Sequence, residues 1–281
     1  MRHHSAAPRT AATLLGALAT AATAAAISAC APATPSASPA PSATAAASAS
    51  APASAAATAR PLQVLFLGHR SEHHNSAAYA PSLTHALVRR GIHLTYEDDP
   101  AVALRPERLR HYDAVLAYAN HETITPDQEK ALLDFVANGG GFVPVHSASF
   151  MFKNSPAYIA LVGAQFATHD TATFAAQTIV RDHPIMQGLE PFTTYDETYV
   201  HTKHNPTDRT VLQERVDGTR REPYTWTRTH GKGRVFYSTL GHVEEAYDNP
   251  LIKQMYVEGI KWALGMTEGH TNPHPKAGSS N

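Results

Sequence analysis

Histidines follow several short apolar runs in this sequence, at points where strands of a buried sheet would end. In the stretch GGGFVPVHSASF, His146 comes directly after an apolar run that begins with three glycines. Imidazole titrates near neutral pH and binds metals, so a histidine there can move a proton or hold a cation. A single histidine at a strand end can equally cap neighbouring backbone groups. The other strand ends therefore decide between these interpretations.

Similar polar segments follow three more apolar runs. They are residues 69–75 after the run 62–67, Asn120 and His121 after 113–118, and Gly241 and His242 after 234–239. Open α/β sheets bind ligands in the crevice beyond the carboxyl ends of their strands, so we expect these side chains to line one site. His74, Asn75 and Asn120 are predicted to contact the ligand there.

The elements that would position these residues alternate along the chain. Strands are predicted at 62–67, 92–96, 113–118 and up to His146, with helices at 76–90 and from Pro126 between them. Later strands at 177–180, 210–216, 224–228 and 234–239 are separated by short turns, and a helix over 250–264 closes the pattern. This order predicts an α/β fold of the flavodoxin-like, doubly wound type, with a mainly parallel sheet and an appended antiparallel portion.

Composition limits the function. The chain has 281 residues and a formal net charge of -1, without a dense cluster of basic residues, so we expect no nucleic-acid partner. It contains 18 histidines and a single cysteine. An internal disulfide and a thiolate-rich metal site are therefore excluded, and any divalent metal would need histidine and carboxylate ligands.

The N-terminal segment has the features of an export signal. A basic start leads into small apolar residues and ends at Ile-Ser-Ala-Cys, which resembles the lipobox of bacterial lipoproteins with Cys30 as the acylated residue. The alternative is a secretory signal cut after a small residue. We expect a signal peptide at 1–30, a disordered Ala/Ser/Pro tether at 31–60, a globular domain at 61–266 and a flexible tail at 267–281. The expected location is the bacterial cell envelope, on the periplasmic side, where a lipid anchor attaches the protein to the membrane.

Six ordered motifs span the globular domain: GGGFVPVHSAS, VGAQFATH, DHPIMQGL, YDETY, GKGRVFYSTLGH and the final KWALG. Together they resemble the trehalose-utilisation (ThuA-like) family. The resemblance implies a sheet of the class I glutamine-amidotransferase type and a role in carbohydrate metabolism, with a small-molecule carbohydrate as the ligand.

The comparison with glutamine amidotransferases argues against glutamine hydrolysis. Those enzymes use a cysteine nucleophile at a strand-to-helix turn and a later His-x-Glu. In this sequence His146 stands where those enzymes have the cysteine. His242-Val243-Glu244 is similar to the His-x-Glu, but no thiol is present in the domain. Ser147 lacks the Gly-x-Ser-x-Gly setting of an activated serine.

The family motifs point to histidine and carboxylate chemistry. The predicted catalytic residues are His146, His169, Glu197 and His242, and Asp196, Tyr199 and Trp226 are predicted to contact substrate. Adjacent Asp196 and Glu197 would face opposite ways on an extended backbone, so we expect Glu197 to enter the site while Asp196 pairs or caps. Trp226 is either a core residue or a platform for a sugar ring.

Three functions fit this set. A histidine and Glu197 can act as acid and base next to a carbonyl, as in an isomerase, epimerase or lyase that acts on an oxidised (keto) glycoside. Alternatively, histidines and a carboxylate hold a divalent metal that polarises the sugar or activates water, as in a metal-dependent hydrolase or lyase. The third function is a tethered carbohydrate-binding lipoprotein without catalysis.

Overall fold

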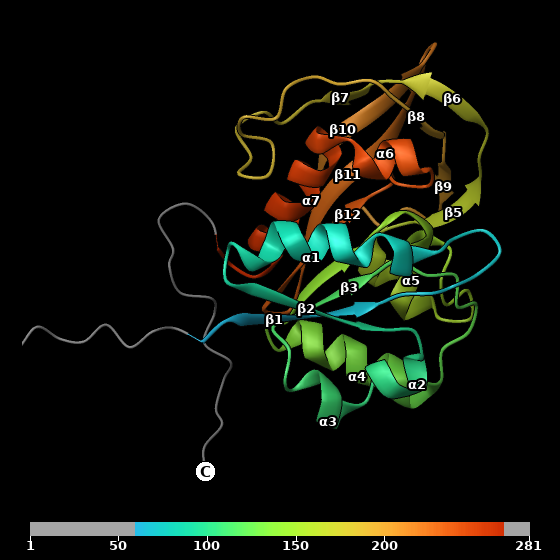
Figure 1. The fold of residues 1–281 in the computed structure, drawn as a ribbon. Coiled ribbons are helices and arrows are strands. Elements are labelled where there is room, and N and C mark those ends of the chain that lie inside the picture. Colours follow the sequence, from blue (N-terminus) through green and yellow to red (C-terminus); the bar gives the residue numbers. More distant parts are fainter. Residues whose placement is uncertain (1–59, 267–281) are drawn as a thin grey trace, which may run out of the picture. The chain divides into compact units, whose positions relative to one another are not determined.

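The computed structural model describes residues 60–266 (Figure 1), so the predicted signal peptide, Cys30, the tether apart from its last residue Arg60, and the tail lie outside the described residues. The strands are β1 (Leu62–Leu67), β2 (Ile92–Glu97), β3 (Ala114–Ala117), β4 (Gly141–Pro144), β5 (Gln165–Thr168), β6 (Thr171–Phe174), β7 (Ala176–Thr178), β8 (Thr194–Glu197), β9 (Val200–Thr202), β10 (Arg209–Asp217), β11 (Arg220–His230) and β12 (Gly233–Ser238). The α-helices are α1 (Ala80–Val88), α2 (Pro100–Ala103), α3 (Pro106–Leu109), α4 (Pro126–Ala137), α5 (Pro156–Val162), α6 (Glu244–Asp248) and α7 (Pro250–Ala263). Two 3-10 helices are η1 (Ser76–Ala78) and η2 (His146–Ser149).

The large sheet has the strand order β2-β1-β3-β4-β12-β11-β10-β7. The pairs from β2 to β12 are parallel, whereas β11, β10 and β7 add to the sheet antiparallel. The chain order reverses between β1 and β3, which is the switch point where sheets of this type bind ligands. The predicted flavodoxin-like sheet with an antiparallel portion is confirmed.

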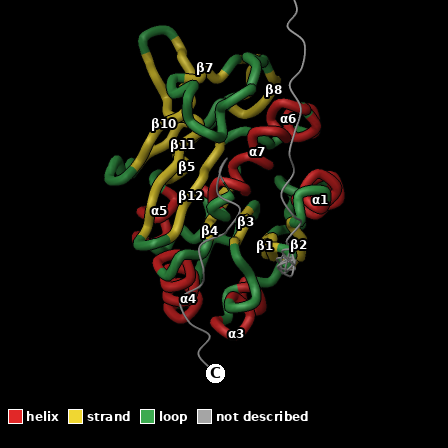
Figure 2. Tube along the Cα trace, turned by 90° about the vertical axis from the view of Figure 1, so that its left-hand side faces the viewer, coloured by secondary structure: helices red, strands yellow, loops and turns green. Residues whose placement is uncertain are grey.

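Helices cover both faces of this sheet (Figure 2). Residues of α1, α6 and α7 pack into one apolar cluster with Val64, Phe66 and Phe236, and residues of α2 to α5 pack into another with Leu65 and Val235. Alternate residues of β1 and β12 enter opposite clusters, as the period of a strand requires. Because both faces are buried, these strands read as continuous apolar runs in the sequence.

Local sequence signals explain where the helices begin. Helix α4 starts with a capping box in which the Thr125 hydroxyl accepts the Gln128 N–H, the Gln128 side chain accepts the Thr125 N–H, and Pro126 opens the first turn. The predicted helix over 76–90 is instead η1 followed by α1, because Pro81 sets a new helix start in the first turn of α1. Two small antiparallel ribbons, β5 with β9 and β6 with β8, were not predicted. Within residues 60–266, no helix is both long enough and apolar enough to cross a membrane.

Candidate functional site

Four side chains from separate elements meet beyond the carboxyl ends of β1, β4 and β12. His74 lies in the loop after β1, His146 starts η2 directly after β4, Glu197 ends β8, and His242 follows β12. The parallel pairing of β4 with β12 continues as a bridge from Val145 to Ser238. The residues that follow these two strands are therefore neighbours, and the topology itself brings His146 beside the loop that carries His242.

One donor atom from each of His74, His146, Glu197 and His242 lies within 4.8 Å of the other three. His74 Nε2 is 3.1 Å from His242 Nδ1, and His242 Nδ1 is 3.4 Å from Glu197 Oε1. The other carboxylate oxygen is 3.3 Å from His146 Nε2. Metal–nitrogen bonds of about 2.0–2.1 Å give a tetrahedron edges of about 3.3–3.4 Å. The three contacts above are on this scale, but they use both oxygens of Glu197, and the set with one donor atom per residue spans up to 4.8 Å.

The tautomer of His146 follows from its backbone partner. His146 Nδ1 is 2.6 Å from the carbonyl oxygen of Thr239, and a carbonyl can only accept, so Nδ1 donates. Nε2 is then turned toward Glu197 and toward the Tyr199 hydroxyl, which is 3.0 Å away. A ring whose second N–H donates to a backbone carbonyl is the usual arrangement of a metal-binding histidine.

Burial controls the charges in this cluster. Burial, and then the nearby rings of His146 and His242, lower the pKa of His74 to about 3. Burial and the proximity of His146 also lower the pKa of His242. Burial alone would raise the pKa of Glu197, but the hydrogen bond and charge of His146, with His242 and His169, bring that pKa below its ordinary value. At neutral pH His74 and His242 are therefore neutral beside the Glu197 carboxylate, which is the protonation state that metal ligands need.

Access to the cluster is from the side of His169 and His242. The His169 side chain is 41% exposed and its Nδ1 is 3.4 Å from Glu197 Oε1, while the His242 side chain is 25% exposed. Tyr199 is buried, and its ring lies beside the rings of His146 and Phe166. His169 can therefore exchange protons with solvent or substrate next to Glu197.

Two residues that we predicted to contact substrate are buried and make structural contacts instead. Asp196 is fully buried, and its two oxygens accept the backbone N–H groups of Gly241 at 2.7 Å and His242 at 3.0 Å. Trp226 is also fully buried: its ring packs on Tyr237 and its Nε1 donates to the carbonyl of Val162. Neither side chain has a free surface toward a ligand in this structure, which agrees with the expectations of a capping Asp196 and a core Trp226, while substrate contact by either residue stays a prediction.

The remaining predicted residues surround the cluster. The Asn120 side chain opposes the lowering of the His74 pKa, and the buried atoms His74 Nδ1 and Asn120 Oδ1 have no hydrogen-bond partner among the described residues. Asn75 is exposed on the loop before η1. Ser147 is buried and donates to the carbonyl of Ala119, so its hydroxyl is committed to the backbone.

The sequence pointed to His74 as a substrate contact, whereas the structure makes it one of the four convergent donors. Because His73 and His74 are adjacent, the sequence did not indicate which of the two rings turns inward. Tyr118 was not singled out, yet its hydroxyl donates to the carbonyl of Gly241 at 2.7 Å and holds the loop that carries His242. No local signal distinguishes such a tyrosine from any other core aromatic residue.

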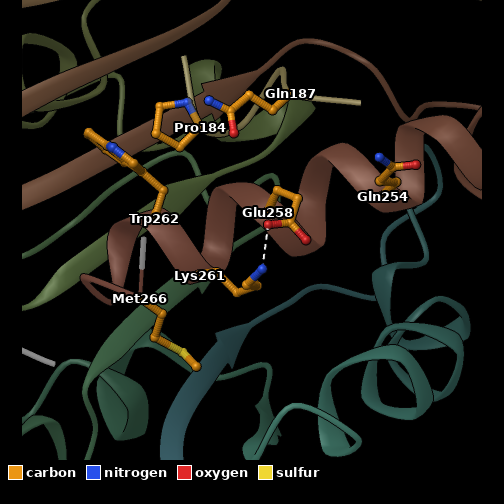
Figure 3. A pocket seen from close by; sticks show the side chains of 7 residues that line it. All are labelled: Pro184, Gln187, Gln254, Glu258, Lys261, Trp262 and Met266. Carbon is orange, nitrogen blue, oxygen red and sulfur yellow. Dashed lines mark hydrogen bonds and ion pairs between the residues drawn. The ribbon is translucent and has the colours of Figure 1, made fainter. Parts of the chain in front are cut away.

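A separate pocket lies along α7, away from these residues (Figure 3). Its walls include Gln187, Trp262 and Met266, and an ion pair between Glu258 and Lys261 lies at its edge. None of the four convergent side chains lines it.

The fold and the cluster define a flavodoxin-like α/β protein with a histidine and carboxylate site at the switch point of its sheet. Residues 63–263 match the ThuA family, described as trehalose utilisation, and the chain belongs to that family. No curated protein matches the sequence.

Solved structures share the fold. A ThuA-like protein from Bacteroides uniformis is 21% identical with a TM-score of 0.66, covering 77% of this chain and 96% of its own. A ThuA-like protein from Parabacteroides merdae is 19% identical with a TM-score of 0.64, covering 75% of this chain and 92% of its own. A β-galactosidase from Rahnella sp. R3 is 15% identical with a TM-score of 0.52, covering 77% of this chain but 33% of its own. At these identities the likeness is one of fold.

Proposed function

We propose that this protein is a carbohydrate-active enzyme that binds a divalent metal ion through His74, His146, Glu197 and His242 and acts on a sugar or keto glycoside. The observation that carries the proposal is the convergence of four donor atoms within 4.8 Å from four separate elements. Three imidazoles and one carboxylate suit Zn²⁺ and neighbouring first-row divalent ions. Membership of a trehalose-utilisation family supports a sugar as the substrate.

The metal would polarise a sugar oxygen or activate water. The residues of the chain supply the rest of the chemistry. The Thr239 carbonyl fixes the His146 ring so that Nε2 faces inward. His169, which is partly exposed and close to Glu197, is placed to take or give a proton at the substrate. The Tyr199 hydroxyl lies 3.0 Å from the inner nitrogen of His146, so a bound metal would take the lone pair that this hydroxyl otherwise contacts.

Metal binding is tested first. The full chain is purified, its metal content is measured by mass spectrometry, and Zn²⁺ affinity is determined by competition with a chelating dye. His74→Ala is expected to lower that affinity at least tenfold, because it removes one of four ligands. His73→Ala is the matched control: this neighbouring ring is exposed and lies outside the cluster. Equal affinities of wild type, His74→Ala and His73→Ala would contradict the proposed centre.

Turnover is tested next. Trehalose and 3-keto glucosides are incubated with the full chain, with and without chelator, and products are followed by NMR. Loss of turnover on chelation and its return with Zn²⁺ would support the proposal. Turnover that is unaffected by chelator would instead support acid–base catalysis by Glu197 and His169. Sugar binding without turnover would support a carbohydrate-binding protein.

A further inference from the structure

The backbone of His146 adopts an unusual conformation at the centre of the proposed site. Its φ angle is 47°, in the left-handed region that residues with a side chain rarely enter. Such a conformation persists only where surrounding contacts hold it, and it is common at functional sites. The contacts that hold the His146 backbone therefore also determine where its ring points.

A buried tyrosine supplies one of these contacts. The Tyr237 hydroxyl lies 3.0 Å from the carbonyl oxygen of His146 and 2.9 Å from the hydroxyl of Ser149, which itself donates to the same carbonyl at 3.2 Å. Tyr237 has no exposed surface, and burial raises the pKa of its phenol, so the hydroxyl keeps its proton. Two residues of one segment thus contact His146. Tyr237, in β12, contacts its main-chain carbonyl, and Thr239, directly after β12, accepts a hydrogen bond from its ring.

Behind Tyr237 lies a buried pair of titratable residues that make no contact with the four convergent donors. His201 Nε2 is 3.2 Å from the Tyr237 hydroxyl, and His201 Nδ1 is 3.0 Å from Glu222 Oε1. The same carboxylate oxygen accepts the backbone N–H of His201 at 2.9 Å, and Arg220 approaches the other oxygen at 3.2 Å. The side chains of His201 and Glu222 are 0% and 5% exposed.

Burying this pair is costly, so its placement calls for a reason. Glu222 accepts but does not donate, so His201 Nδ1 carries a proton toward it and the ring is fixed in orientation. Nε2 then accepts and lies 3.2 Å from the Tyr237 hydroxyl, whose oxygen is also 3.0 Å from the carbonyl of His146, so the single hydroxyl proton serves one of these two acceptors at a time. Neither residue of the pair hydrogen-bonds one of the four donors. Tyr237 links the pair to the His146 main chain, and the His201 ring also packs edge-on against Tyr199.

We propose that Glu222, His201 and Tyr237 form a positioning chain that holds the left-handed backbone of His146 and so sets the geometry of the metal centre. The inference rests on the proposed metal site. It assigns no chemical step to these three residues. On this inference, the affinity for metal depends on residues other than the four donors. Their contacts run from the solvent-facing Arg220 through Glu222, His201 and Tyr237 to the His146 main chain.

The test compares two buried tyrosines. Tyr237→Phe removes the hydroxyl that contacts His146, whereas Tyr158→Phe removes a buried hydroxyl that donates to the carbonyl of Ala148, in the same 3-10 turn, at 2.8 Å. Both variants lose a buried hydrogen bond, so both are expected to melt at a lower temperature. Tyr237→Phe is expected to weaken Zn²⁺ binding about 10- to 100-fold, the usual effect of losing an outer partner of a ligand. Tyr158→Phe is expected to leave the affinity within about twofold of wild type.

A spectroscopic measurement separates position from stability. Co²⁺ bound to the full chain reports ligand geometry through its visible absorption, which we expect to shift in Tyr237→Phe and in Glu222→Gln but not in Tyr158→Phe. Wild-type affinity and spectrum in Tyr237→Phe would overturn the inference, and so would an equal loss of affinity in Tyr158→Phe.

The proposed function is tested separately by metal binding to the wild type. If the wild type bound no metal, that proposal would fail on its own, and the inference would be decided by NMR of ¹⁵N-labelled histidine. The His146 ring signals should then move in Tyr237→Phe and not in Tyr158→Phe, and unmoved signals would overturn the positioning chain.

Discussion

Asp196 offers a sharp test of how the site is built, because the two roles expected from the sequence, a substrate contact and a cap, give opposite results. The carboxylate lies fully buried at the end of β8, and each oxygen accepts a backbone N–H of the loop that carries His242. Asp196→Asn keeps the shape of the side chain but replaces one accepting oxygen with an amide that can only donate. One of the two loop N–H groups would then face another donor.

The expected loss follows from these two bonds. A hydrogen bond to a charged group contributes about 1.5–3 kcal/mol, and the N–H left buried adds to the loss, so we expect about 2–4 kcal/mol in total. For a domain of this size 1 kcal/mol corresponds to about 2–4 °C, which gives a decrease in melting temperature of about 4–16 °C. Metal affinity should also fall, since Gly241 and His242 would no longer be fixed.

Thermal melts in the presence of chelator measure the first effect without a contribution from bound metal. Asp170→Asn is the matched control, since it makes the same chemical change on an exposed side chain close by, with an expected effect within about 0.5 kcal/mol. The reasoning is refuted if Asp196→Asn melts like the wild type and instead raises the KM for a sugar. That result would restore Asp196 as a substrate contact.

Further predictions concern other parts of the chain. Trp226→Ala should destabilise the protein by about 3–5 kcal/mol in thermal melts, because the ring fills the core, whereas a sugar platform would change KM with little loss of stability. Thr125→Ala should cost about 1 kcal/mol through the lost cap of α4, with unchanged Zn²⁺ affinity. We also propose that Cys30 is acylated, so that Cys30→Ala moves the protein from the membrane to the soluble fraction; unchanged fractionation would contradict this.

Acid should unfold this protein partly through His201 and Glu222. Burial lowers the pKa of His201, and the bonds from His201 outweigh burial and lower the pKa of Glu222. The unfolded chain therefore binds more protons than the folded one below about pH 6.5, so stability is lost as the pH falls through that range. The double variant His201→Gln/Glu222→Gln should show a flatter dependence of melting temperature on pH, and a slope equal to that of the wild type would count against this account.

The fold was predictable because its signals are local. Continuous apolar runs mark β1, β3 and β4, whose two faces are both covered, and Thr125-Pro126 marks the start of α4. The ribbons β5 with β9 and β6 with β8 escaped prediction because they are short, and most of β5 and β6 is exposed. Without a buried face, the sequences of β5 and β6 carry no strong alternation, and pairing with a distant strand is what makes them strands.

The site was predictable only as a set of strand ends. Sequence order indicated that His146 and His242 would share an edge of the sheet, because parallel strands end together there. It could not show that the His74 ring turns inward while His73 stays exposed, since that depends on the path of the loop between β1 and η1. Nor could it show that both oxygens of Asp196 would accept hydrogen bonds from the N–H groups of a loop more than forty residues away.

The same geometry explains why several polar residues near the cluster contact its backbone and rings instead of its open side. Four donor atoms repel one another when they lie this close, so surrounding contacts must hold the backbones that carry them. The left-handed backbone of His146 also needs such contacts. Asp196 holds the His242 loop and Thr239 holds the His146 ring, while Tyr237 holds the His146 main chain. A residue type that suggests catalysis in the sequence can thus serve only to orient another residue. Burial does not make the distinction in this domain, since His146 is as fully buried as Asp196; the partners do, because Asp196 contacts only backbone N–H groups whereas the four clustered side chains turn donor atoms toward one another.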